Sequence, residues 1–246
     1  MKTKGLILLS LALFIGCQNS QQAKKTSTPQ SKEAFVPVKS YAVVWNWTEG
    51  NTVEGVLPII QKQVPSIIDL WRKGVIENAY IENESKLNEN EKYPNAFFVI
   101  KGKNEQEVRA VLEDTPAFKA GITKYELYPI GMKWLNRNDK SIQMVTEGKK
   151  SFATVWTIKF DKKFEQFLEQ QNQKILELWN KGVIENAYLD VGNRDQKKPP
   201  LVFFTNAQNA EEADKLLKEL PFVKENVATY TLYPVGYFWM SSSRAT

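Results

Sequence analysis

The amino-acid sequence predicts an α+β fold made of two tandem βαββαβ units. The first observation is an internal repeat, because SYAVVWNW at residues 40–47 is matched by SFATVWTI at 151–158. The second is the heptapeptide GVIENAY, which occurs unchanged at 74–80 and again at 182–188. The third is that both copies place segments typical of strands and of helices in the same order. A duplicated packed unit whose loops have drifted accounts for all three observations.

The second copy shows the order of its elements most clearly. Its first segment is rich in β-branched and aromatic residues, as strands are, and Asp161 then stands where the N-cap of a helix belongs. Apolar residues follow at helical spacing until Gly182, which suits a left-handed C-cap. The expected elements are a strand at 152–158, a helix from 161 to 181, a strand in the second GVIENAY, a strand at 201–205, a helix from the capping box at 209–212 to Pro221, and a strand at 229–235.

The first copy repeats this order with one expected difference. Its second helix again begins with a capping box, at residues 104–107, and stops before Pro116. Its first helix contains Pro58 and Pro65, and proline removes a backbone donor and clashes with the preceding turn. We therefore expect that helix to be kinked or split, and the two copies to differ most there.

The order β-α-β-β-α-β is that of the ferredoxin-like fold, in which both helices cover one face of an antiparallel sheet. Large aromatic residues on the strands indicate that the other face is covered too, because exposed apolar patches of that size usually mark an interface. Two units in one chain can meet this need by packing sheet to sheet, as an intramolecular pseudo-dimer. The expected boundaries are a signal peptide at 1–16, a disordered tether at 17–39, a first unit at 40–137, a linker at 138–150, a second unit at 151–240 and a tail at 241–246.

The net charge of +5 does not indicate a nucleic-acid partner. Six of the 33 basic residues and one of the 28 acidic residues precede residue 40, which leaves 27 of each sign in the rest of the chain. Binding to nucleic acid requires a basic surface that displaces counterions from phosphates. We therefore expect no nucleic-acid partner.

The N-terminus has the pattern of an export signal. Lys2 and Lys4 precede an apolar run at residues 6–15 that is too short to span a bilayer, and the run ends at Gly16 and Cys17. This arrangement resembles a bacterial lipoprotein signal, which implies that Cys17 is lipidated and anchors the chain to the membrane. The polar segment that follows is expected to be a tether. The predicted location is the cell envelope, at the outer membrane if the organism is Gram-negative.

Three motifs carry a resemblance to a known superfamily. They are LW-x-K-G-V-I-x-N-A-Y, the helix end LPFVK at 220–224, and Y-x-L-Y-P-V-G at 230–236. Together they resemble the dimeric α/β-barrel superfamily, nearest to muconolactone isomerase-like and YciI-like domains. Those domains form the barrel from two chains, so the resemblance implies that this chain carries both halves. It covers nearly all of residues 40–240, and its motifs concern the fold and not catalysis.

The chain contains no histidine and a single cysteine. This excludes Ser-His-Asp and Cys-His catalysis, a histidine general base, histidine-ligated haem, and histidine-based zinc or iron sites. The resemblance implies a His-Asp pair in YciI-like relatives and histidine-held iron in haem-degrading members, and neither can be transferred to this chain. A glycine-rich phosphate loop is also absent from the sequence. We expect no metal site and no cofactor.

The GVIENAY strands supply most of the candidate site residues. Strict alternation puts Glu77 on one face of its strand and Asn78 with Tyr80 on the other, and the sequence does not decide which face lines a cavity. A glutamate in a cavity can move a proton; otherwise each glutamate lies at a strand edge or pairs with Lys73 or Lys181. The candidate cavity residues on these strands are Asn78, Tyr80, Asn186 and Tyr188, and the candidate acid/base residues are Glu77 and Glu185.

The first strand of each unit supplies the remaining candidates. Trp45 and Trp156 are candidates for a ligand wall, because a first strand in this fold crosses the centre of the sheet. Asn46 beside Trp45 resembles the Asn and Trp pairing of cofactor-independent monooxygenases in the superfamily. Thr157 replaces this asparagine in the second copy, so such a site would be single.

Two functions remain open from the sequence, and the first is preferred. One is a non-enzymatic envelope lipoprotein that binds a small apolar ligand in its barrel or contacts another envelope protein. The other is a histidine-free barrel enzyme, either a muconolactone isomerase-like isomerase or a cofactor-independent monooxygenase. A location outside the cytoplasm and the lack of histidine favour the binding protein.

Overall fold

A computed structural model describes residues 38–83, 86–190 and 200–239. All of them belong to one compact unit, Val36–Thr246. The predicted signal peptide, the lipidation at Cys17, nearly all of the tether and the tail lie outside the described residues.

The described elements follow the order expected from the repeat, with short additions. The first half contains β1 (Lys39–Trp47), α1 (Val53–Arg72), β2 (Ile76–Glu82), β3 (Asn95–Gly102), α2 (Glu105–Glu113), α3 (Pro116–Lys119) and β4 (Thr123–Leu135). The connecting segment forms α4 (Asp139–Thr146). The second half contains β5 (Lys150–Ile158), α5 (Lys162–Asn180), β6 (Ile184–Leu189), β7 (Leu201–Ala207), α6 (Ala210–Lys218), α7 (Pro221–Lys224) and β8 (Ala228–Phe238).

The predicted helix caps are confirmed. Asn104 and Asn209 each accept a hydrogen bond from the backbone N–H three residues on, and Asp161 caps α5 in the same way. Of the two expected forms of the first helix, kinked or split, the split does not occur, because α1 is one continuous helix with Pro58 and Pro65 inside it. Its buried face packs on the sheet and offsets what the prolines cost.

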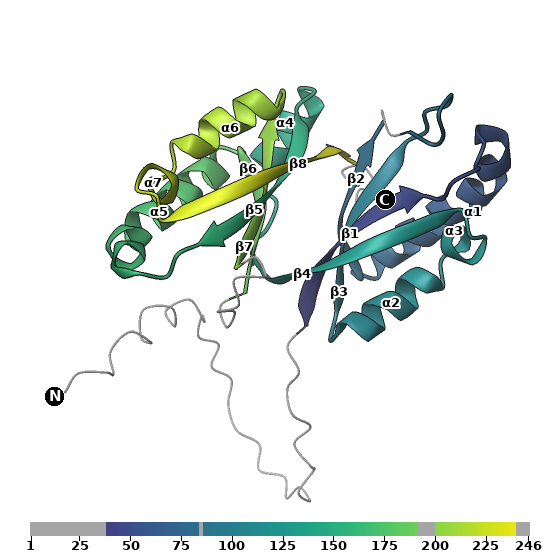
Figure 1. Ribbon diagram of the computed structural model, residues 1–246, viewed down its shortest axis with the longest axis horizontal. Coiled ribbons are helices and arrows are strands. Elements are labelled where there is room, and N and C mark those ends of the chain that lie inside the picture. Colours follow the sequence, from purple (N-terminus) through teal and green to yellow (C-terminus); the bar gives the residue numbers. More distant parts are fainter. Residues whose placement is uncertain (1–37, 84–85, 191–199, 240–246) are drawn as a thin grey trace, which may run out of the picture. The chain divides into compact units, whose positions relative to one another are not determined.

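Eight antiparallel strands form one closed barrel in the order β1-β3-β2-β8-β5-β7-β6-β4. Within each half the strands pair as a ferredoxin-like unit requires, and the halves are joined where β2 pairs with β8 and β4 pairs with β6. The predicted α+β class is therefore confirmed. Figure 1 shows the helices of each half lying beside its strands, and α1 contacts β2 as α5 contacts β6.

One glycine sits at each joint between the halves. Gly131 on β4 and Gly236 on β8 both have φ of +87°, a conformation that glycine adopts most readily. A Cβ atom at Gly236 would lie 2.0 Å from the carbonyl oxygen of Ile81, and one at Gly131 would lie 2.6 Å from the backbone of Leu189. The glycine of each Y-P-x-G motif therefore allows the backbones of the two halves to approach.

Candidate functional site

A β-bulge changes the face on which the two GVIENAY glutamates lie. The pairing of β2 with β3 shifts between Ile76 and Asn78, and that of β6 with β7 shifts between Ile184 and Asn186. A bulge inserts one residue and interrupts the alternation of side chains. Glu185 consequently lies on the same face of the sheet as Asn186. Strict alternation, which would put these two side chains on opposite faces, therefore does not hold here.

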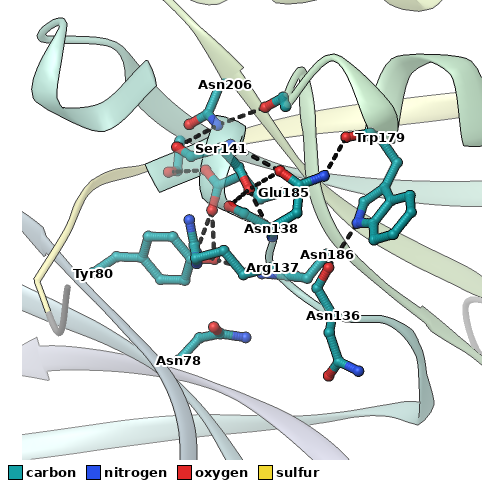
Figure 2. A network of polar contacts seen from close by, with 12 residues as sticks. Asn78, Tyr80, Asn136, Arg137, Asn138, Ser141, Trp179, Glu185, Asn186 and Asn206 are labelled. Carbon is teal, nitrogen blue, oxygen red and sulfur yellow. Dashed lines mark hydrogen bonds and ion pairs between the residues drawn. The ribbon is translucent and has the colours of Figure 1, made fainter. Parts of the chain in front are cut away.

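Glu185 lies at the centre of a buried polar network (Figure 2). Its carboxylate pairs with the guanidinium of Arg137 and accepts hydrogen bonds from Ser151 and from the hydroxyl of Tyr80, the last at 3.2 Å. The Tyr80 hydroxyl also accepts from Arg137 at 2.9 Å and from Asn186 at 3.2 Å. Glu185 is fully buried, and only 10% of the Arg137 side chain is exposed.

Arg137 is held in place by the segment that connects the halves. Its guanidinium lies 3.5 Å from the ring centroid of Phe238. On one side of it the carbonyl of Asn136 accepts from the Trp179 indole at 2.6 Å, and on the other Asn138 donates to the Trp179 carbonyl at 2.6 Å. Figure 2 shows these anchors flanking Arg137. The connection is thus tied to α5 at two points, and Arg137 projects into the barrel between them.

A similar set of contacts surrounds Tyr188. Asn78 donates to the Tyr188 hydroxyl at 2.5 Å, and Lys133 lies 5.7 Å from the centre of the Tyr188 ring. Lys133 also pairs with Glu77 at 3.1 Å, and Glu77 accepts from Ser40 at 2.6 Å. Each tyrosine therefore receives a hydrogen bond from an asparagine of the other half, and a cation pairs with the glutamate of each bulge.

Burial raises the pKa of Tyr80 and of Tyr188 well above the usual value of 10.0. The carboxylate of Glu185 raises the pKa of Tyr80 further, and that of Glu77 does the same for Tyr188. The pKa of Arg137 is also raised: burial alone would lower it, and Glu185 and Tyr80 more than reverse that effect. These phenols stay protonated and this guanidinium stays charged at any physiological pH.

The barrel interior around this network is filled by aromatic rings. Tyr80 stacks on Phe204 with ring centroids 5.0 Å apart, and Phe97 packs against both. The expected pairing of the glutamates with Lys73 or Lys181 does not occur, because those lysines pair with neighbours on their own helices, Asp69 and Glu177. Glu185 pairs with Arg137 instead, and Glu77 pairs with Lys133. A buried carboxylate that is paired with a cation, such as that of Glu185, is suited to joining the two halves and poorly suited to transferring protons.

A pocket of about 490 Å³ lies between α1 and strands of the first half, and residues 237–239 at the end of β8 complete its wall. This volume is within the range of small-molecule sites. Among the described residues, no charged residue lines it, and most of its wall is aromatic or aliphatic. The lining residues include Trp45, Trp47, Gln63, Phe98, Ala117 and Phe238.

At two positions near the start of α1 and in α3, the first half has smaller side chains than the second half. In the repeat, Pro116 corresponds to Pro221, so Ala117 stands where the second half has Phe222. Phe222 is buried and packs on Phe164 with ring centroids 5.3 Å apart, and the residue corresponding to Phe164 is Val56. Ala117 lines the pocket, and an alanine at this position leaves space that Phe222 occupies in the second half.

The structure separates the remaining predicted site residues. Trp45 lines the pocket and packs edge-on against Phe98 at 5.5 Å. Trp156 is a core residue of the second half, 1% exposed and packed on Phe203. Asn46 is half-buried, and alternation along β1 places it on the face opposite Trp45.

Sequence reasoning missed Trp47, Gln63, Ala117 and Arg137. Comparing the two copies position by position would have found Ala117, since a small residue opposite a phenylalanine in a repeat indicates unfilled volume.

Metal and membrane sites can be assessed only for the described part of the chain. Within it, no cluster of three or more cysteine, aspartate or glutamate side chains is placed to hold a metal ion. No helix in residues 38–83, 86–190 or 200–239 is both long and apolar enough to cross a bilayer.

No model of a known protein family matches the sequence, and no curated protein matches it. Among solved structures, a chlorite dismutase from Candidatus Nitrospira defluvii in complex with imidazole has a TM-score of 0.51 at 11% identity, covering 82% of this chain and 91% of that chain. A mutant of the same enzyme in complex with cyanide has a TM-score of 0.48 at 11% identity, covering 81% and 90%. At this identity the likeness shows the fold alone.

These comparisons correct three predictions, namely the family resemblance, the function and the lack of enzymatic activity. The resemblance to muconolactone isomerase-like and YciI-like domains is wrong, because the matching structures are chlorite dismutases. The preferred function, a binding lipoprotein without enzymatic activity, is contradicted as well, because the solved structures that share this fold are those of an enzyme, chlorite dismutase. Aromatic rings pack around the candidate residues of the GVIENAY strands. The structure supports a chlorite dismutase-like α+β fold of eight antiparallel strands.

Proposed function

We propose that the protein is an enzyme of the chlorite dismutase-like fold whose substrate, a planar organic molecule, binds in the pocket of the first half. The observation that carries this proposal is the pocket itself, with its volume of about 490 Å³ and its aromatic wall. Flat molecules gain most from aromatic walls, because rings stack or meet edge to face. The enzyme named in the structural comparison supports catalysis on this fold.

The lining favours a neutral molecule. An ionised group brought into this pocket would lose its hydration and would meet no opposite charge on the wall. The Arg137 and Glu185 network cannot supply that charge, because both groups are engaged with each other inside the barrel. The substrate we propose therefore has a flat apolar body and uncharged polar groups.

Haem, which the fold suggests, does not fit the residues present. The chain has no histidine to ligate the iron, and Cys17, its one cysteine, lies outside the described residues. No described residue of the pocket wall offers a cation to the acidic side chains of a haem. We therefore derive no step through haem.

The test compares the natural chain with Ala117→Phe, which places in the first half the side chain that fills the second half. Both proteins would be incubated with a bacterial small-molecule extract, and compounds consumed and formed would be followed by mass spectrometry. The expected result is a compound that the natural chain consumes and Ala117→Phe leaves unchanged. Ala120→Phe, at an exposed position of the same short segment, is the matched control and should behave as the natural chain.

Each other outcome overturns part of the proposal. A compound that is retained by the natural chain and recovered unchanged would show binding without catalysis. Equal consumption by the natural chain and Ala117→Phe would place the reaction elsewhere. No consumption and no retention would remove the pocket as a substrate site.

The mirrored contacts also support an intramolecular pseudo-dimer of two βαββαβ halves. Asn78 and Asn186 each donate to the tyrosine of the opposite half. If the halves are equivalent, Asn78→Ala and Asn186→Ala should lower the free energy of unfolding by similar amounts, about 1 to 3 kcal/mol each. Strongly unequal losses in denaturant titrations would argue against this equivalence.

A further inference from the structure

The amide of Gln63 is one of the polar groups that line the pocket, together with the amides of Asn83 and Asn95. Gln63 lies on α1, and its Oε1 accepts a hydrogen bond from the backbone N–H of Ala117 at 2.9 Å. Because that donor requires the oxygen, the orientation of the amide is fixed and its –NH₂ group is the free end. Gln63 lines the pocket, and among the described residues no acceptor pairs with its Nε2.

In the second half, the corresponding amide lies beside a phenylalanine instead of an alanine. Gln171 is the corresponding residue, and its Oε1 accepts from the backbone N–H of Phe222 at 3.0 Å. Its Nε2 is sealed from solvent and has no partner in the described part of the chain. Gln63 Nε2 is not sealed in this way. With alanine at position 117, the Nε2 donor of Gln63 therefore stays accessible, whereas the Nε2 donor of Gln171 is buried.

Other unpartnered donors in the pocket wall are less suited to a ligand. Trp45 Nε1, Trp47 Nε1 and Thr123 Oγ1 also lack acceptors among the described residues, but all three atoms are sealed from solvent. A ligand oxygen reaches them only if side chains move. Gln63 presents its donor to the pocket without rearrangement.

We propose that Gln63 donates a hydrogen bond to a carbonyl-type oxygen of the pocket ligand and so selects for ligands that carry one. The inference rests on the proposed function and narrows its substrate to neutral planar carbonyl compounds. When a carbonyl ligand binds in an apolar pocket, a donor on the wall gains a hydrogen-bond partner. When a hydrocarbon binds, the same donor loses its hydrogen bond to water and gains none. Gln63 is in this sense a specificity-determining residue.

The test uses two probes of the same shape, 9-fluorenone with a carbonyl and fluorene without one. Binding would be measured through the quenching of tryptophan fluorescence, since Trp45 and Trp47 line the pocket. We expect the natural chain to bind fluorenone about fivefold more tightly than fluorene, the effect of one net hydrogen bond. Gln63→Glu keeps an acceptor for Ala117 and removes the donor, so it should bind fluorenone no better than fluorene.

Gln63→Met provides a second, uncharged variant that removes the donor at similar length, and it should also lose the preference. Ala117→Phe should weaken both probes equally because it fills the pocket. Equal affinity of the natural chain for both probes would overturn the role of Gln63 and leave the pocket standing. Failure to bind either probe, with no difference between the natural chain and Ala117→Phe, would overturn the pocket and the proposed function with it.

Discussion

The guanidinium of Arg137 pairs with the carboxylate of Glu185 inside the barrel, where the carboxylate is fully buried. Arg137 comes from the segment between the halves, and Glu185 from a bulge in the second half. Two charges removed from water stabilise little by themselves, but either one left alone costs much. The pair therefore makes correct docking of the connecting segment a condition for a stable fold.

We expect Arg137→Met to lower the free energy of unfolding by about 3 to 5 kcal/mol, because it leaves the buried Glu185 charge unpaired. The double change Arg137→Met with Glu185→Gln should recover most of this loss. Urea titrations of the single and double variants would measure the coupling. Lys133→Met is the matched control and should cost less, because 24% of the Lys133 side chain is exposed. Additive losses in the double variant would show that the two charges act independently.

The glycines at the joints give a second prediction. At Gly236 a Cβ atom would meet the Ile81 carbonyl oxygen at 2.0 Å, and that backbone belongs to a paired strand. Gly236→Ala should therefore disrupt the joint and lower the midpoint of thermal unfolding strongly. Gly121→Ala has a positive φ of 69° but meets no atom within 4 Å, so it should cost only about 1 kcal/mol. Equal losses at both positions would mean that φ matters and close approach does not.

Alkaline pH should destabilise the protein through Tyr80 and Tyr188. Burial raises the pKa of both in the folded state, whereas in the unfolded chain the pKa returns to about 10. Below pH 10 both states are protonated and the stabilisation is complete. Above pH 10 the unfolded chain releases protons that the folded state keeps, so stability falls as pH rises.

The slope of this loss should approach about 1.4 kcal/mol per pH unit for each tyrosine. Denaturant titrations between neutral and alkaline pH would measure it, and absorbance titration of the phenols would locate their ionisation. Tyr188→Phe should remove part of the slope. A slope that is unchanged in both Tyr80→Phe and Tyr188→Phe would assign the alkaline loss to other groups.

Local patterns in the sequence predict the elements because each pattern acts within a few residues. Asn104, Asp161 and Asn209 cap the helices as expected, since a cap needs only the backbone that follows it. The continuity of α1 through Pro58 and Pro65 depends on packing against the sheet, which lies outside that local window. The order of elements was thus predictable, and the shape of one helix was not.

The site was harder to predict because its contacts join distant segments. The sequence offers three alternatives for Glu185, a cavity position, a strand edge or a pairing with Lys181, whereas its partner Arg137 lies 48 residues away. The β-bulge at Glu185 could not be predicted from the alternation of apolar and polar residues, because a bulge interrupts that alternation without a local sequence pattern. The difference between Ala117 and Phe222 was visible in the repeat, but its meaning depends on the contact between Phe222 and Phe164.

That contact gives the last prediction, which treats each half as the control of the other. Phe222→Ala should open in the second half the space that the first half already has and should lower the free energy of unfolding by about 3 to 5 kcal/mol, the usual cost of a buried phenylalanine. Ala117→Phe fills an existing pocket and should cost far less or stabilise the fold. Chemical denaturation of both variants measures this difference. If Ala117→Phe proved as costly as Phe222→Ala, the walls around Ala117 would be too rigid to admit a ring, and the pocket would be smaller than its volume indicates.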